Sequence, residues 1–168
     1  MKKLCPKHIR VLGIAASWQG IGFAVMENES RLVDWGSKRG NGDKNARCLS
    51  HVGNLVAQYA PNVIALESTR LEGSRRHLRV QSLIDQIVRM AEEEKIKVKR
   101  FSRKELSAGF LSNDEGTKHD VALHLAARFP EELGFRLPRK HTLLVNEDCR
   151  MDMFDAVALA EHFLRSGE

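Results

Sequence analysis

The chain has 168 residues, a length that suits one domain with its own hydrophobic core. Hydrophobic residues make up 42% and charged residues 29%, as in soluble globular proteins, and no apolar run approaches the ~20 residues of a membrane span. The formal net charge of +5 favours a polyanionic partner without specifying one.

The cysteines and the first residues bear on the cellular setting. Cys5, Cys48 and Cys149 are odd in number and far apart, so neither a disulfide framework nor a CxxC metal site is implied. Residues 1–10 are basic but lead directly into a strand-like run without a small-residue cleavage signal. We therefore expect a reduced, cytoplasmic setting, no secretory leader and no membrane partner.

The first part of the chain predicts three strands. Residues 8–16 (HIRVLGIAA) form a short apolar run bounded by polar residues, which indicates a buried strand. Residues 20–27 and 31–36 predict two more strands, joined by a turn at residues 28–30. Three strands with such short links indicate an antiparallel meander.

Helices and strands then alternate. Apolar positions at helical spacing predict a helix over residues 43–59, which Pro61 ends, and a long amphipathic helix over residues 74–94. Short apolar runs predict strands at residues 62–67 and 96–101. This alternation is typical of parallel strands joined by crossover helices.

The remaining chain predicts helices only. Two short helices are expected at residues 103–110 and 117–128, and a last helix over residues 151–164 is apolar on most sides, so it should be largely buried. The predicted fold class is α/β, with a mixed five-stranded sheet of three antiparallel and then two parallel strands flanked by helices. This element order resembles the ribonuclease H-like fold, and we expect one such domain over residues 1–168.

Three acidic residues stand where a carboxylate needs an explanation. Glu67 ends a predicted buried strand, where α/β proteins often form sites, and the alternative is a surface glutamate just past the strand. Asp152 and Asp155 are three residues apart, which puts both on one face of the last helix. A helix cap explains Asp152 well, but Asp155 lies in an apolar stretch and needs a partner such as a hard divalent cation.

These motifs together resemble the RuvC branch of the DNA-junction nucleases. Residues 12–17 (LGIAAS) and 21–25 (IGFAV) resemble its first hairpin, where a strand ending in Gly-Ile-Asp leads to a Gly-aromatic-Gly/Ala-Val strand. Residues 63–68 (VIALES) resemble its fourth strand, and residues 152–160 (DMFDAVALA) resemble its closing helix. The segment between residues 70 and 140 matches only in its pattern of elements.

The resemblance implies cleavage of four-way (Holliday) DNA junctions, with four carboxylates holding two Mg²⁺ or Mn²⁺ ions about 3.5–4 Å apart. It carries Glu67, Asp152 and Asp155 over as catalytic metal ligands. The fourth ligand, an aspartate in the first strand, is Ala15 here, so we expect weak metal binding and little cleavage. The resemblance also implies a homodimer, because a four-way junction needs two symmetric cuts.

Ala15 has two explanations. It is either an engineered Asp→Ala change that inactivates a resolvase, or native to a protein that binds DNA without cutting it. We favour the first, because three acids are retained and a natural loss would leave less reason to keep a buried Asp155.

Other polar residues near the predicted site have simpler explanations. Asp114, Glu115 and Asp120 could replace the missing acid, but their segment is more typical of a loop followed by a helix cap. His119 could assist proton transfer, although a surface histidine is favoured, and His162 is expected to be structural or exposed.

Basic residues cluster around the predicted site. Six of the ten residues 95–104 are Lys or Arg, and further clusters lie at residues 70–79 and 139–141. Trp18 follows the first strand, where it could stack on an unpaired base or pack under the loop. The predicted DNA contacts are Trp18, Arg70, Arg75, Arg76, Lys104 and Lys118.

Three functions remain open from the sequence. The leading hypothesis is a structure-selective endonuclease for four-way junctions, inactivated at Ala15. The second is a nucleic-acid-binding module without catalysis, and the third is a nuclease of the same fold with another substrate, such as RNA in an RNA–DNA hybrid. An actin-like nucleotide-binding protein is disfavoured, because the chain is too short for two lobes and has no second phosphate loop.

Overall fold

The computed structural model describes residues 8–68, 75–111, 116–137 and 150–166, and the strands among them form one five-stranded sheet in the order β3-β2-β1-β4-β5. β1 (Arg10–Ala16), β2 (Gly20–Glu27) and β3 (Arg31–Arg39) form an antiparallel meander. β4 (Val63–Glu67) pairs parallel with β1, and β5 (Lys97–Phe101) pairs parallel with β4. The predicted mixed sheet is confirmed.

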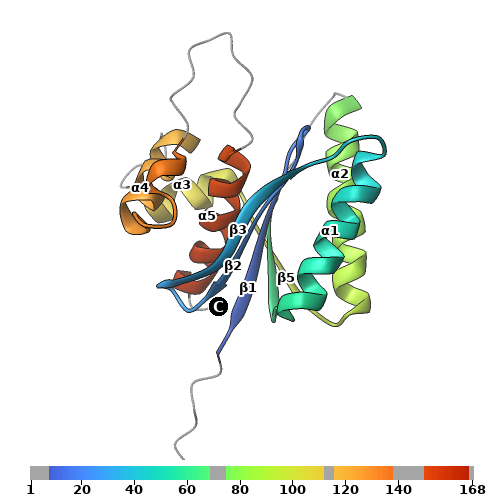
Figure 1. Cartoon of the computed structure of the whole chain (residues 1–168), viewed down its shortest axis with the longest axis horizontal. Helices are drawn as coiled ribbons and strands as arrows, with labels where there is room; N and C mark the ends of the chain where they lie inside the picture. The colour runs from blue at the N-terminus through green and yellow to red at the C-terminus, as the bar shows by residue number, and fades with distance from the viewer. Residues whose placement is uncertain (1–7, 69–74, 112–115, 138–149, 167–168) are drawn as a thin grey trace, which may run out of the picture.

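Helices cover both faces of the sheet (Figure 1). α1 (Lys44–Tyr59) and α2 (Arg75–Glu93) lie on one face. α5 (Arg150–Ser166) lies against the other face, and α3 (Arg103–Phe110) and α4 (Lys118–Arg128) pack on α5. The 3₁₀ helix η1 (Gly134–Arg136), which the sequence analysis does not predict, follows α4.

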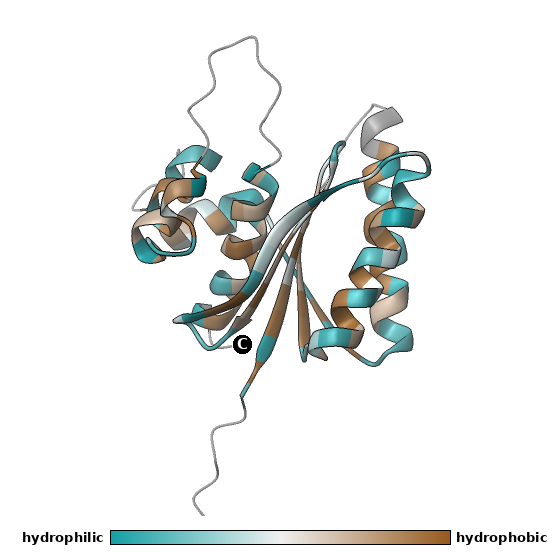
Figure 2. Ribbon diagram, viewed as in Figure 1, coloured by the Kyte–Doolittle hydropathy of each residue, from teal (hydrophilic) through white to brown (hydrophobic). Residues whose placement is uncertain are grey.

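Strand residues alternate between two hydrophobic cores, one on each face of the sheet. Val11 and Ala15 of β1 belong to the core with α5, whereas Leu12 and Ile14 belong to the core with α1 and α2. Figure 2 shows hydrophobic segments along the strands and along the helix sides that face them. Because of this alternation, the side chain of residue 15 faces α5.

The last helix is as buried as its sequence predicts. Residues 151–161 of α5 are all buried, because the helix lies between the sheet on one side and α3 and α4 on the other. No helix among the described residues has the length and hydropathy needed to cross a membrane.

The end of β3 differs from the sequence-based prediction, and the end of α1 agrees with it. β3 continues to Arg39, beyond the predicted end at residue 36, because its hairpin with β2 pairs Gly20 with Arg39. α1 ends at Tyr59, where Ala60 takes a left-handed conformation (φ 44°), just before Pro61. Pairing with β2 therefore sets the end of β3, whereas α1 ends where its local sequence predicts.

Candidate functional site

The ends of β1 and β4 and the first half of α5 bring the predicted site residues together. β1 and β4 run parallel, and Ala15 and Glu67 follow one residue after their last paired positions, at the same edge of the sheet. The side chain of Ala15 is buried in the core beneath α5. Asp152 and Asp155 are buried on α5, with 6% and 3% of their surface exposed.

Two glycines allow α5 to lie directly on the sheet. A Cβ added at Gly22, the cross-strand partner of Ala15, would lie 2.0 Å from the carbonyl group of Asp152. A Cβ added at Gly13 would lie 2.1 Å from the carbonyl oxygen of Ala156. Only glycine fits at such an approach of backbone to backbone. Gly13 and Gly22 therefore set the height of α5 above the β1–β2 hairpin.

Asp152 is held from the turn between β1 and β2. The hydroxyl of Ser17 donates a hydrogen bond to Oδ2 of Asp152 at 2.6 Å, and the main-chain N–H of Gln19 donates to the hydroxyl of Ser17 at 3.2 Å. The hydroxyl thus partners a buried carboxylate, which would otherwise be costly to desolvate. Ser17 was not among the predicted site residues, and its place directly after β1 was the available signal.

Arg103 binds two of the predicted acids at once. Its Nε and Nη2 donate to Oε1 and Oε2 of Glu67 at 3.2 and 2.8 Å, a bidentate arrangement. Its Nη1 donates to Oδ1 of Asp155 at 3.0 Å. Arg103 reaches Glu67 because β5 pairs Phe101 with Glu67, and Ser102 then caps α3. The guanidinium therefore connects the end of β4 with α5.

Lys118 supplies a second positive charge. Its Nζ lies 3.2 Å from Oδ2 of Asp155, and its side chain is 39% exposed. Lys118 begins α4, where Thr117 and Asp120 form a capping box. Thr117 is the helix cap, as the sequence suggests, and Asp120 completes the capping box. The place of Lys118 beside the acids is clear, while its role in DNA binding stays a prediction.

The charge of Arg103 is secured by its partners. Burial by itself would lower the pKa of Arg103, but the charges of Asp155 and Glu67 and their hydrogen bonds outweigh burial and raise this pKa above its ordinary value. An arginine is already protonated throughout the pH range in which proteins fold. The site therefore keeps this cation at any pH at which the chain is folded.

These contacts do not fit the expected pair of divalent ions. In the part of the chain that the structure describes, no group of three or more His, Cys, Asp or Glu side chains is placed to hold a metal ion. Both oxygens of Glu67 and both oxygens of Asp155 face a guanidinium or an ammonium group instead. Ala15 supplies no oxygen ligand, and Glu67 and Asp155 have protein cations as partners.

In the sequence, Arg103 stands out only as one of the basic residues 95–104. An arginine at the start of a short helix resembles a surface residue, so its partners are not evident from local sequence. The available signal is its place just after β5, at the same edge of the sheet as Glu67. His162, expected to be structural or exposed, packs its ring against Phe101 at 4.6 Å between centroids.

Trp18 lies at the turn between β1 and β2 and is 36% exposed. The ammonium group of Lys44 lies 5.6 Å from the centre of its ring. Nη2 of Arg79 donates to the carbonyl oxygen of Trp18 at 2.6 Å, which ties the turn to α2. The ring is therefore neither fully packed under the loop nor fully free.

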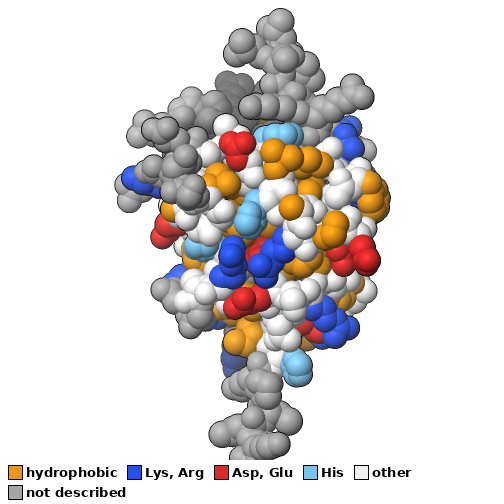
Figure 3. Space-filling view, turned by 90° about the vertical axis from the view of Figure 1, so that its left-hand side faces the viewer, with side chains coloured by type: hydrophobic (Ala, Val, Ile, Leu, Met, Phe, Trp, Pro, Cys, Tyr) orange, Lys and Arg blue, Asp and Glu red, His pale blue; other side chains and the backbone are white. Residues whose placement is uncertain are grey.

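The other predicted DNA contacts are placed only in part. Lys104 is exposed on α3. Arg70 and the side chains of Arg75 and Arg76 lie outside the described residues, as do Asp114 and Glu115. Figure 3, which views the side of the molecule where α3 and α4 lie, shows basic side chains mixed with acidic and apolar ones. That face is therefore not a continuous basic surface.

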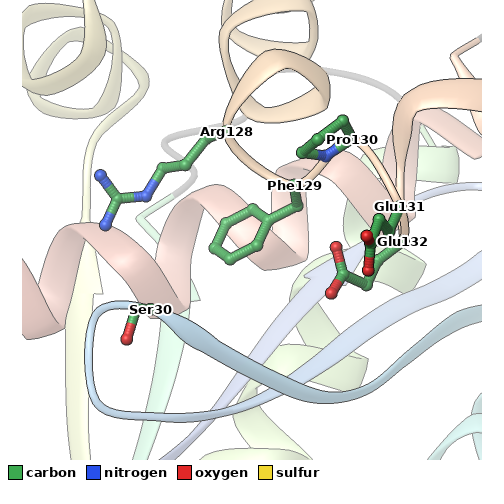
Figure 4. A pocket seen from close by; sticks show the side chains of 6 residues that line it. All are labelled: Ser30, Arg128, Phe129, Pro130, Glu131 and Glu132. Carbon is green, nitrogen blue, oxygen red and sulfur yellow. The ribbon is translucent and has the colours of Figure 1, made fainter.

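A pocket of about 330 Å³ lies at the opposite end of the sheet (Figure 4). It is lined by Ser30, in the turn between β2 and β3, by Arg128 at the end of α4 and by residues 129–132 after it. None of the predicted site residues that the structure describes lines it, and Arg10 pairs with Glu27 at this end, far along β1 from Ala15. The pocket and the cluster of acids are therefore separate features.

Known structures resemble this chain over nearly its whole length. RuvC of Thermus thermophilus in complex with Holliday junction substrate matches with a TM-score of 0.74 and 18% identity, covering 95% of this chain and 97% of that one. The yeast mitochondrial Holliday junction resolvase Ydc2 matches with a TM-score of 0.62 and 19% identity, covering 94% and 80%. The fowlpox virus resolvase in complex with junction DNA matches with a TM-score of 0.59 and 14% identity, covering 93% and 99%.

Sequence comparison finds no matching family model and no matching curated protein. The relationship to the resolvases is therefore visible in the structure, at sequence identities of 14–19% for these three proteins. Likeness at this level establishes the fold, and the resemblance noted in the sequence is confirmed at that level. The chain has the ribonuclease H-like fold of the RuvC-like Holliday junction resolvases.

Proposed function

We propose that this chain binds four-way DNA junctions and does not cleave them. The fold supports junction binding, because two of the similar structures contain a resolvase in complex with Holliday junction DNA. The residues at the predicted site support the absence of cleavage. The observation that carries the proposal is the pairing of Arg103 with both Glu67 and Asp155 on a resolvase fold that has alanine at position 15.

Hydrolysis by the expected mechanism would need two divalent ions, one to activate water and one to stabilise the leaving oxygen. The carboxylates of this chain do not fit such a pair, so no hydrolytic step is assigned to them. The proposed activity is therefore the binding of branched DNA through basic side chains and through stacking on an aromatic ring.

Cations near the sheet edge would contact the DNA backbone. Lys118 and Lys104 are exposed in whole or part, and Arg70, Arg75 and Arg76 follow β4 in the sequence. Contacts of this kind hold the register of a protein on DNA but give little sequence specificity. They account for the basic charge of the chain and predict a salt-dependent affinity.

Trp18 would provide selectivity for branched DNA. Its ring is partly exposed, lies near Lys44, and is carried on a turn that Arg79 holds to α2. An aromatic ring held in this way can stack on a base that has lost its neighbour at the crossover, whereas a continuous duplex offers no such base. A homodimer would present this feature twice, matching the two-fold symmetry of a junction.

The test compares binding and cleavage on matched substrates at one salt concentration. A labelled four-way junction, a duplex of the same sequence and an RNA–DNA hybrid are titrated by anisotropy, then incubated with Mg²⁺ or Mn²⁺ and run on a denaturing gel. We expect the junction to bind at least about tenfold more tightly than the duplex, or about 1.4 kcal/mol, with no strand cut.

Each other result has a defined meaning. Paired symmetric nicks in the junction by the unaltered chain would identify an active resolvase and contradict the proposal. Cleavage of the RNA strand in the hybrid would favour a nuclease with another substrate. Equal affinity for junction and duplex would contradict selectivity for branched DNA.

A further inference from the structure

We propose that Arg103 takes the place of a divalent cation in this fold, so that the site excludes Mg²⁺ and Mn²⁺ and an acid at position 15 alone does not restore metal binding. This role of Arg103 rests on the proposed function and names the positive charge that stands where the metal ions would bind. Its test measures metal binding without DNA, so it can fail or succeed independently of junction binding.

The geometry uses every oxygen of two carboxylates. The guanidinium binds both oxygens of Glu67 and one oxygen of Asp155, and Lys118 binds the second oxygen of Asp155. A divalent ion would need at least some of these oxygens, because carboxylates are the ligands that Mg²⁺ and Mn²⁺ prefer. The ion would therefore have to displace protein cations before it could bind.

Burial makes that displacement unfavourable. The side chains of Arg103, Glu67 and Asp155 are 27%, 21% and 4% exposed. A divalent ion entering beside the guanidinium would place like charges together where water screens them poorly. If the guanidinium left instead, it would give up a bidentate contact with Glu67 and a hydrogen bond to a nearly buried aspartate.

Position 15 cannot change this arrangement by itself. An aspartate at position 15 would add a carboxylate near Asp152, because Ala15 is the cross-strand partner of Gly22 and Gly22 lies against the backbone of Asp152. The contacts of Arg103 with Glu67 on β4 and with Asp155 on α5 would remain. Two changes are therefore needed to open a metal site, one that adds a ligand and one that removes the cation.

The same contacts explain why Asp155 is present without a metal. A nearly buried aspartate in an apolar helix needs a compensating charge, and Arg103 and Lys118 provide it. This removes the main reason to regard Ala15 as an engineered change in an otherwise intact metal site. Arg103 and Ala15 together favour a chain in which the alanine is native.

The experiment measures Mn²⁺ binding by isothermal titration calorimetry with no DNA present. The variants are the unaltered chain, Ala15→Asp, Ala15→Asp with Arg103→Gln, and Ala15→Asp with Arg100→Gln. Arg100 is exposed on β5, so its replacement removes the same charge from a nearby position outside the network. We expect Ala15→Asp with Arg103→Gln to bind Mn²⁺ at least about tenfold more tightly than each of the other three proteins.

Thermal unfolding first establishes that each variant is folded. If the Arg103→Gln pair is unfolded, Arg103→Met with Ala15→Asp replaces it, because methionine removes the charge while its unbranched, flexible side chain can fill the space. We then expect this pair to bind Mn²⁺ more tightly than Ala15→Asp alone. Stoichiometric Mn²⁺ binding by the unaltered chain, or no gain from replacing Arg103 in a folded variant, overturns the inference.

Discussion

The backbone of Asp152 lies so close to Gly22 that a single Cβ at Gly22 would come within 2.0 Å of the Asp152 carbonyl group. This contact joins the β1–β2 hairpin to the helix that carries the buried acids. The position of Asp152 and Asp155 therefore depends on the lack of a side chain at Gly22 as well as on the charged residues around them.

Gly22→Ala should destabilise the fold and displace α5. Overpacking of this kind costs about 1–3 kcal/mol, and the displaced helix should also weaken the contact between Arg103 and Asp155. Urea unfolding measures the free energy. Gly53→Ala is the control, because Gly53 lies in α1 with its nearest neighbour, Sδ of Met90, 3.8 Å from the added Cβ. Gly53→Ala should be neutral or stabilising, and equal losses for both variants would contradict the close contact.

Ser17→Ala should reduce stability through Asp152. The hydroxyl donates to a buried carboxylate at 2.6 Å, and a hydrogen bond to a charged group contributes about 1.5–3 kcal/mol. Ser50→Ala, at an exposed position in α1, removes a hydroxyl of the same size without a buried partner. Urea unfolding should show a loss for Ser17→Ala alone, and the prediction fails if the two variants are equally stable.

Glu161 should make stability depend on pH. Burial raises the pKa of Glu161 above its ordinary value of 4.5, and the nearby Arg128 and Arg165 only partly oppose this. The pKa of Glu161 is therefore higher in the folded chain than in the unfolded chain. The stability that the protonated Glu161 side chain provides is fully present below pH 4.5 and is lost as pH rises through the folded pKa.

Glu161→Gln removes the ionisation while keeping the side-chain size. Urea unfolding of both proteins across this pH range should show the unaltered chain losing stability relative to Glu161→Gln as pH rises. Other titrating groups are common to the two proteins, so they largely cancel in the difference. A constant difference would mean that the pKa of Glu161 is not shifted by folding, and a difference that moves in favour of the unaltered chain would mean that the charge of Arg128 outweighs burial.

Trp18→Ala should weaken junction binding more than duplex binding. Stacking of one base on an aromatic ring contributes about 1–3 kcal/mol, and only the junction offers an unstacked base. Phe135→Ala is the control, because Phe135 is a more exposed aromatic, at 74%, that lies in η1 outside the site. Anisotropy titrations should show a larger loss for Trp18→Ala on the junction, and equal losses on both DNAs would place Trp18 outside the crossover.

Much of the fold is predictable because it rests on local patterns. The long amphipathic helix α2 and the buried helix α5 follow from apolar spacing, and β1 and β4 follow from short apolar runs. Glu67, Asp152 and Asp155 are recognisable because each is a charge at the end of, or within, an apolar element. η1 is too short for a periodic signal, and β3 is longer than its own residues indicate because β2 provides pairing partners.

The pairing of Glu67 and Asp155 with Arg103 is not predictable from local sequence. Arg103 is 36 residues from Glu67 and 52 from Asp155, and it meets them only because β5 pairs parallel with β4 in one register. A shift of that register would point Arg103 elsewhere. The sequence therefore identifies which acids need partners, and the three-dimensional arrangement identifies a cation of the chain itself as the partner.

The most direct test is the affinity for a four-way junction relative to a duplex of the same sequence, measured by anisotropy in EDTA and again in Mg²⁺ at equal ionic strength. A chain whose site is neutralised by Arg103 should prefer the junction by the same factor in both solutions. A preference that appears only with Mg²⁺, or no preference in either, would contradict junction binding without a metal.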